Sequence, residues 1–259
     1  MNNLKISNLS LALAALMVTI TLIISYYQKL RLNKEIIWSI FRAIVQLIII
    51  GFALRFIFKV NNLFLTILMM IFIVVNAAYN GKKRAHGINH AFLISFVGLF
   101  CGTAITVSLM LLTKVMKPAP FQTIPVTGMI AGNAMAAVGL VYSNLNQSFR
   151  ENSEKIEEML ALGASPKLAA GEIVRQALHF GLQPTIDSVR MYGLVQLPGM
   201  MSGLIMAGFD PVEAIKYQIL VVFMLFCSTG ISTSITGFWA YRQYFDQNWR
   251  LTIPKVEKK

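Results

Sequence analysis

Apolar stretches recur from one end of this chain to the other, and they restrict its possible folds more than any other feature. A helix needs roughly 20 residues to cross the hydrocarbon core of a bilayer. The stretches that meet this length lie at about 8–27, 36–58, 63–80, 91–113, 122–145, 190–209 and 214–241. The sequence therefore predicts one all-α, polytopic membrane domain over residues 1–259, with about seven transmembrane helices.

The composition supports this class. Only 13% of the residues are charged, whereas soluble domains carry roughly 25%, so the lipid bilayer must act as the solvent. The first stretch lacks the basic start and the cleavage pattern of a signal peptide, and we expect a retained span. Cys101 and Cys227 lie inside apolar runs, which predicts buried thiols without a disulfide or a metal motif.

The basic residues divide unequally between the two sides that seven spans define. Sixteen fall on one side: Lys29, Arg31, Lys34, Lys82, Lys83, Arg84, Arg150, Lys155, Lys167, Arg175, Arg190, Arg242, Arg250, Lys255, Lys258 and Lys259. Six fall on the other: Lys5, Arg55, Lys59, Lys114, Lys117 and Lys216. Because cytoplasmic loops carry the excess of Lys and Arg, we expect the N-terminus outside and the C-terminus in the cytoplasm. The basic residues stand at the ends of apolar runs, so the net charge of +12 does not indicate nucleic-acid binding.

Two segments depart from the simple pattern of spans. The stretch at 122–145 contains three glycines with Pro120 and Pro125 nearby, which is compatible with a full span and with a broken or partly re-entrant helix. Residues 146–189 are polar and predict a cytoplasmic helix–turn–helix. There Gly163 suits a left-handed helix end, Ser165 an N-cap, and Pro166 the first helical position. A solvated connector between spans is the plainer alternative.

Several motifs resemble known transport proteins. The run from Glu158 through Leu162 to Pro166 is similar to the cytoplasmic "EAA"-type loop of ABC permeases, although this chain has Met159 after two glutamates and its downstream Pro184 lies late. The longer stretches 41–58, 76–84, 124–140 and 197–218 resemble the FetB family of iron-export permeases, whose plant relatives are aluminium-tolerance half-transporters.

This resemblance implies a permease in a bacterial inner membrane that exports iron or another metal as two permeases with two cytoplasmic ATPases. ATP and Mg would bind the ATPase, and this chain would bind no cofactor and catalyse no reaction. The sequence agrees, because it contains no G-x-x-x-x-G-K-[ST] phosphate loop. The resemblance assigns contact with the ATPase to Glu157, Glu158, Leu162, Gly163, Ala164, Ser165 and Pro166. An ABC half-transporter for an organic solute, such as a nucleotide sugar, and a non-transporting scaffold that recruits an ATPase remain alternatives.

Polar and sulfur-bearing residues within the spans are candidates for the transport pathway. They are Arg42, Gln46, Asn76, Asn80, Met129, Asn133, Met135, Met200 and Met201. For Arg42 the alternative is snorkelling to the membrane edge, and for the methionines it is the filling of irregular gaps between helices.

Three G-x-x-x-G patterns predict close helix contacts. They are Gly98 with Gly102, Gly128 with Gly132, and Gly199 with Gly203. From the sequence, each pair is equally compatible with a contact inside the bundle and with a seam between two copies.

Overall fold

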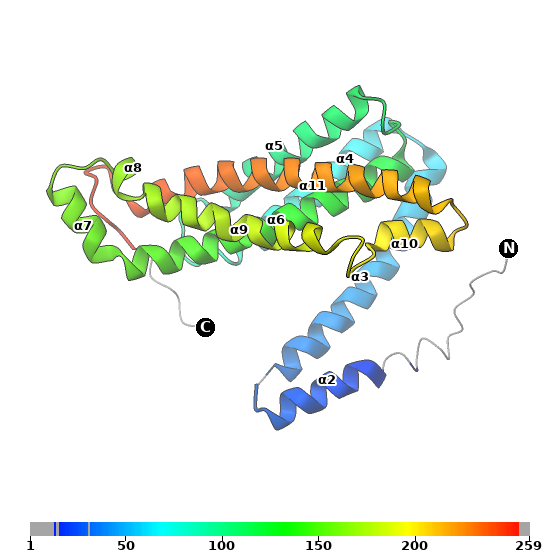
Figure 1. The fold of residues 1–259 in the computed structure, drawn as a ribbon, viewed down its shortest axis with the longest axis horizontal. Coiled ribbons are helices and arrows are strands. Elements are labelled where there is room, and N and C mark those ends of the chain that lie inside the picture. The colour runs from blue at the N-terminus through cyan, green and yellow to red at the C-terminus, as the bar shows by residue number, and fades with distance from the viewer. Residues whose placement is uncertain (1–12, 14–15, 31, 254–259) are drawn as a thin grey trace. The chain divides into compact units, whose positions relative to one another are not determined.

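The computed structural model describes residues 13, 16–30 and 32–253, and it divides into two compact units, 1–60 and 61–259. The first unit contains α2 (Leu16–Tyr27) and α3 (Asn33–Val60), which contact each other as a helical hairpin (Figure 1). Most of the predicted stretch 8–15 that precedes α2 lies outside the described residues.

The second unit is built on four long helices. They are α4 (Leu63–Lys82), α5 (Ala91–Leu112), α6 (Pro120–Glu151) and α11 (Pro211–Ala240). The helices α5 and α6 both contact α11, and α4 contacts α5 and α6. Together with α3, these are the five helices within the described residues that are long and apolar enough to cross a membrane. The all-α membrane class is thus supported, whereas the predicted count of seven spans is not confirmed.

The structure resolves the ambiguity at 122–145, because α6 is one continuous helix. It contains Pro125 without a break. A proline lacks the N–H that would donate to the carbonyl four residues earlier. Here that carbonyl lies in the first turn of the helix, so only one hydrogen bond at the helix start is lost. The interpretation of this stretch as a broken or re-entrant helix is therefore wrong.

The predicted span at 190–209 is wrong as a continuous helix. The helix α9 (Gly171–Met191) ends there, residues 192–198 are not helical, and α10 (Gly199–Met206) has only eight residues. Eight residues rise about 12 Å, too little to cross a bilayer. The break has a local cause, because Gly193 adopts a φ of +81° and Pro198 caps the next helix from an extended conformation.

The polar segment has two different parts. α7 (Ser153–Ala161) and α8 (Pro166–Ala169) lie at one end of the second unit, whereas α9 runs along α6 and α11 (Figure 1). A Cβ at Gly181 of α9 would lie 2.5 Å from Val141 Cγ2 and 3.0 Å from the Ala137 carbonyl oxygen of α6. Only a glycine permits this approach. The second limb of the segment is thus a packed part of the bundle.

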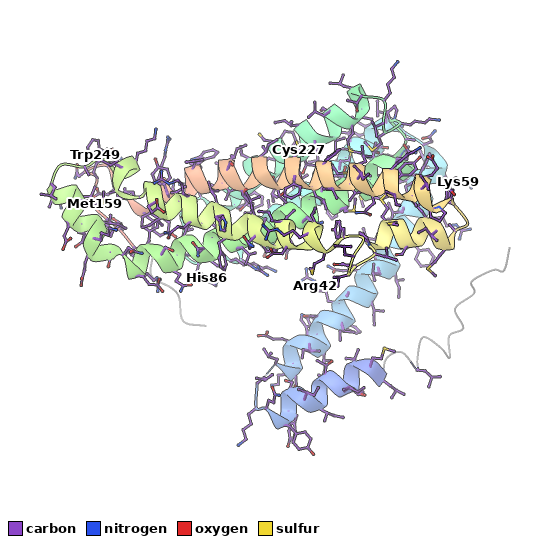
Figure 2. The ribbon with its side chains drawn as sticks, viewed as in Figure 1. Arg42, Lys59, His86, Met159, Cys227 and Trp249 are labelled. Carbon is purple, nitrogen blue, oxygen red and sulfur yellow. The ribbon has the colours of Figure 1, made fainter. Side chains whose placement is uncertain are left out.

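Residues 241–251 pack at the same end of the unit. After the 3₁₀ turn η1 (Tyr241–Tyr244), Phe245 and Leu251 form an antiparallel bridge. The Tyr244 ring stacks on Phe149 of α6 with centroids 4.0 Å apart. Figure 2 shows Trp249 from this segment at the end where Met159 of α7 lies.

Candidate functional site

The turn after α7 has the predicted local geometry. Gly163 has a φ of +91°, its N–H donates to the Leu160 carbonyl at 3.0 Å, and the Ala164 N–H donates to the Met159 carbonyl at 2.9 Å. This pair of bonds is the Schellman arrangement that ends a helix. Ser165 then caps α8, with its hydroxyl accepting from the Leu168 N–H at 3.4 Å, and Pro166 begins that helix.

The seven residues predicted to contact an ATPase form one accessible surface at this turn. None of them is buried, and Leu162 is 89% exposed. The helix α7 packs against the bundle through its other side, where Ile156 is 1% exposed and belongs to the main hydrophobic core. We call the surface of Glu157, Glu158 and Leu162–Pro166 the docking turn.

A groove of about 520 Å³ lies beside the docking turn and is walled on its other side by residues 248–251. Asp246 holds that wall in place, since its carboxylate accepts from the N–H groups of Asn248 and Arg250 at 2.8 Å each. Trp249 is 57% exposed. The sequence did not predict this wall. An Asp two residues before an Asn is a turn signal, but nothing in the sequence indicates that this turn adjoins Gly163.

The start of α9 carries an exposed ion pair near the docking turn. Arg175 donates to Glu172 at 2.7 Å. The hydrogen bond and the positive charge of Arg175 lower the pKa of the Glu172 carboxyl. Exposed ion pairs of this kind contribute little to the free energy of folding.

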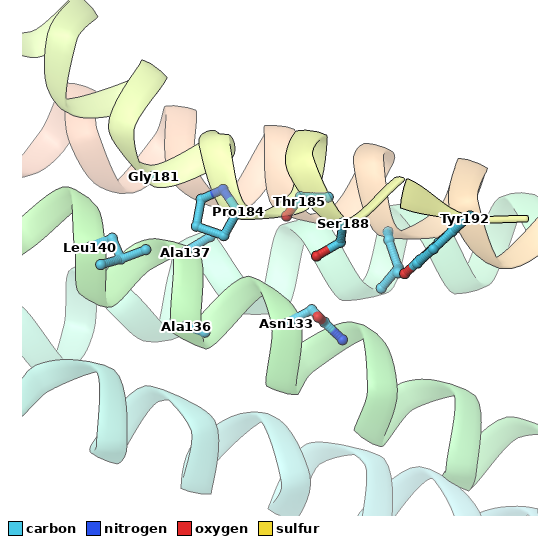
Figure 3. A pocket seen from close by; sticks show the side chains of 10 residues that line it. Asn133, Ala136, Ala137, Leu140, Gly181, Pro184, Thr185, Ser188 and Tyr192 are labelled. Atoms are coloured by element: carbon cyan, nitrogen blue, oxygen red, sulfur yellow. The ribbon is translucent and has the colours of Figure 1, made fainter. Parts of the chain in front are cut away.

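A second hollow lies between α6 and α9 (Figure 3), with a volume of about 110 Å³. Its polar lining residues are Asn133 of α6, Thr185 and Ser188 of α9, and Tyr192 just after α9. Figure 3 shows the hydroxyls of Ser188 and Tyr192 turned toward α6, on the side where Asn133 lies. We call it the α6–α9 pocket.

The predicted pathway residues do not converge on this pocket. Only Asn133 lines it. Met129 and Met135 pack against two different hydrophobic clusters. Asn76 and Asn80 bond to each other on α4 at 2.8 Å.

The remaining pathway candidates lie on other helices. Arg42 and Gln46 belong to α3 in the first unit, and Met200 and Met201 belong to α10. Within the described residues, no group of three or more His, Cys, Asp or Glu side chains is placed to hold a metal ion. In the sequence, the spacing of Thr185, Ser188 and Tyr192, three and four residues apart, is that of one helix face, and this spacing is the signal that could have indicated the lining.

The three glycine pairs differ in what they meet. A Cβ at Gly98 would lie 2.5 Å from Thr236 Oγ1, and one at Gly102 would lie 2.7 Å from the Ser228 carbonyl oxygen, so this pair is a seam between α5 and α11. For Gly128, Gly132, Gly199 and Gly203 no atom lies within 4 Å of such a Cβ. The sequence left both roles open, and the structure assigns the first pair to the bundle.

Comparisons with known proteins agree over most of the chain. A family model described as uncharacterised protein family UPF0014 matches residues 8–245. The chain is 47% identical over 259 residues to the Escherichia coli (strain K12) protein named "Probable iron export permease protein FetB", with 100% of both chains covered. It is 35% identical to "Protein ALUMINUM SENSITIVE 3" of Arabidopsis thaliana, covering 93% of this chain and 88% of that one. It is 34% identical to the UPF0014 membrane protein YjkA of Bacillus subtilis (strain 168), covering 92% and 95%. No solved structure matches this chain.

Proposed function

Because this chain belongs to the UPF0014 family of membrane proteins, as its motifs predicted, we propose that it is the permease subunit of an ABC exporter for iron or a related metal ion. One observation carries the proposal: 47% identity, end to end, to a relative whose name states iron export. Energy would come from a separate cytoplasmic ATPase that binds ATP and Mg. Two copies of this chain would pair with two ATPase subunits in the inner membrane of a bacterium.

The docking turn is the proposed contact with the ATPase. It combines a large apolar side chain, Leu162, which is 89% exposed, with the exposed carboxylates of Glu157 and Glu158. A few fully desolvated side chains supply most of the binding energy of a protein interface, and Leu162 is the large apolar side chain that this turn offers to a partner. The Schellman bonds and the Ser165 cap hold the turn in one shape, so little ordering entropy is lost on binding.

Helices connect the docking turn directly to the bundle. α6 ends at Glu151, just before α7, and reaches back to Asn133 in the α6–α9 pocket. These 18 residues of continuous helix span about 27 Å. α9 begins just after α8 and runs to the same pocket. A displacement of the docking turn by the closing ATPase dimer would therefore move both walls of the pocket.

The test is ATP-dependent accumulation of Fe(II) in inverted vesicles that contain this chain and its partner ATPase, with Zn(II), Mn(II), Cu(I) and Al(III) as competitors. We expect Glu158→Lys and Gly163→Pro to abolish accumulation while the chain still inserts into the membrane. Glu213→Lys is the matched control, because Glu213 is an exposed carboxylate in the first turn of α11 that pairs with Lys216 at 2.6 Å, away from the docking turn.

Three results would overturn the proposal. Normal accumulation in both docking-turn variants would exclude this surface as the point of coupling. ATP hydrolysis without uptake of any metal would favour an organic cargo, and no stimulation of the ATPase by this chain would favour a scaffold.

A further inference from the structure

The α6–α9 pocket indicates where the cargo passes, an inference that rests on the proposed function. We infer that Asn133, Thr185, Ser188 and Tyr192 form a transit site for a hard divalent cation that keeps part of its hydration shell. The four side chains line one pocket, and all of them offer oxygen atoms.

The hydroxyl groups of this pocket are free to bind a ligand. In the apolar helices, Thr106 and Thr233 each donate to the carbonyl four residues earlier at 2.7 Å, which is the usual way for a helix to satisfy a hydroxyl. Within the described part of the chain, no hydrogen bond engages the hydroxyls of Thr185, Ser188 or Tyr192. Their lone pairs therefore remain available to an ion or to its waters.

An amide group and the end of a helix also lie at this pocket. The Asn133 amide nitrogen donates to the Met129 carbonyl at 2.8 Å. The amide oxygen takes no part in this bond. The helix α9 ends at the pocket, where the Tyr192 N–H donates to the Val189 carbonyl at 3.2 Å. The C-terminal end of a helix carries partial negative charge on its last carbonyls and attracts cations.

The pocket lies within the apolar length of the bundle. The connection between α4 and α5 meets α6 near Gly139, against which Arg84 lies, and at Asn146, which donates to the Ala85 carbonyl at 2.9 Å. Asn133 precedes Gly139 by six residues of α6. It therefore lies about 9 Å farther from this connection along the helix. Polar groups at such a depth, next to a broken helix, are typical of ion sites in transporters.

The chemistry of the lining indicates the class of ion. Asp187, the nearest carboxylate on α9, accepts from Gln183 at 2.9 Å and lies 3.7 Å from Arg190, and it is not among the residues that line the pocket. Neutral oxygen donors suit hard divalent ions and disfavour Cu(I), which prefers sulfur. Without a carboxylate ligand the ion is held weakly, as passage requires.

The size of the pocket agrees with an ion and not with an organic solute. Its volume of about 110 Å³ corresponds to roughly four water molecules. Pockets for organic ligands measure about 300–1,000 Å³. An ion with some of its waters fits a pocket of this size.

The direct test is equilibrium binding of Mn(II), an oxygen-preferring ion with an electron paramagnetic resonance signal, to the full chain in lipid nanodiscs without the ATPase. We expect Thr185→Val combined with Ser188→Ala to weaken Mn(II) binding about tenfold, the lower limit for removing supporting groups from a metal site. The matched control is Thr113→Val combined with Ser202→Ala, because both hydroxyls already donate to carbonyls of their own helices. Unchanged binding in the pocket variant, or an equal loss in the control, would overturn the assignment.

A gain of affinity separates the site from a folding defect. Asn133→Asp adds a carboxylate to the pocket, and we expect Mn(II) to bind about tenfold more tightly and to be exported more slowly. A damaged protein would not gain affinity, and an unchanged affinity would exclude Asn133 from the site. If the pocket binds Mn(II) but no metal is transported with the ATPase, the proposed function fails while the site stands. If metal is transported normally by the Thr185→Val, Ser188→Ala variant, the site fails while the function stands.

Discussion

Single residues decide where the helices of this bundle touch, and Gly102 makes the sharpest prediction. Its missing side chain lets α5 approach the Ser228 carbonyl of α11, which a Cβ would reach at 2.7 Å. A new Cβ could be accommodated only if the backbone of α11 shifted, which costs free energy. Gly102→Ala should therefore lower the stability of the detergent-solubilised protein by about 1–3 kcal/mol. Gly132→Ala is the control, because a Cβ there meets no atom within 4 Å. Equal thermal unfolding midpoints for the two variants would contradict the close α5–α11 seam.

A buried hydrogen-bond chain ties the C-terminal segment to α6 and to the connection between α4 and α5. The Tyr244 hydroxyl donates to Asn146 Oδ1 at 2.7 Å, and Asn146 Nδ2 donates to the Ala85 carbonyl at 2.9 Å. Tyr244→Phe would leave the buried amide oxygen without a donor, at a cost of about 1–3 kcal/mol. Thermal unfolding should show this loss, whereas Tyr217→Phe, at a position that is 46% exposed, should have no effect. A midpoint unchanged by Tyr244→Phe would mean that this chain of bonds does not hold the segment.

Among the elements, the docking turn combines an exposed anchor with a rigid frame. Leu162→Ala should leave thermal stability unchanged, because this side chain is 89% exposed. It should weaken binding of the ATPase about tenfold or more if the partner buries Leu162 completely, since truncating such a side chain costs about 2 kcal/mol or more. Leu112→Ala serves as the control, since Leu112 is 78% exposed at the end of α5 away from the turn. Binding of the purified ATPase to nanodiscs measures both. Equal affinities for the two variants would remove Leu162 from the interface.

Elements with a strong local signal were predictable from the sequence. Length and hydropathy located α3, α4, α5 and α11 to within a few residues, and the Gly163 turn followed from three residues of known local preference. The end of α9 was missed because an apolar stretch hides a break that Gly193 and Pro198 impose together. The α6–α9 pocket was missed for a different reason. Its residues come from α6 and α9, and no local rule states that these helices lie side by side.

At the scale of the whole molecule, the open glycine pairs bear on assembly. An added Cβ would meet open space at Gly128, Gly132, Gly199 and Gly203, in contrast to the glycines of the α5–α11 seam. Such open glycine faces allow close approach of another helix in lipid. If they form the seam between two permeases, Gly132→Leu or Gly203→Leu should reduce the dimer fraction without lowering the unfolding midpoint. Light scattering in detergent measures the fraction. An unchanged dimer fraction in both variants would leave these faces outside the seam.

The predicted orientation of the molecule depends on which end of the bundle carries more positive charge. The Asn146–Ala85 hydrogen bond of 2.9 Å brings the connection with Lys82, Lys83 and Arg84 to the end of the second unit that carries the docking turn. Lys117 lies in the connection between α5 and α6, at the other end of α6. Because positive charge is retained in the cytoplasm, the docking turn should face inward.

Cysteine labelling tests this orientation. In a chain with Cys101 and Cys227 replaced by alanine, Lys117→Cys should react with a membrane-impermeant maleimide in intact cells, since its position would face outward. Leu162→Cys, although 89% exposed in the structure, should react only after the membrane is permeabilised. The opposite pattern would place the docking turn outside, where no cytoplasmic ATPase reaches it, and the proposed coupling would fail with it.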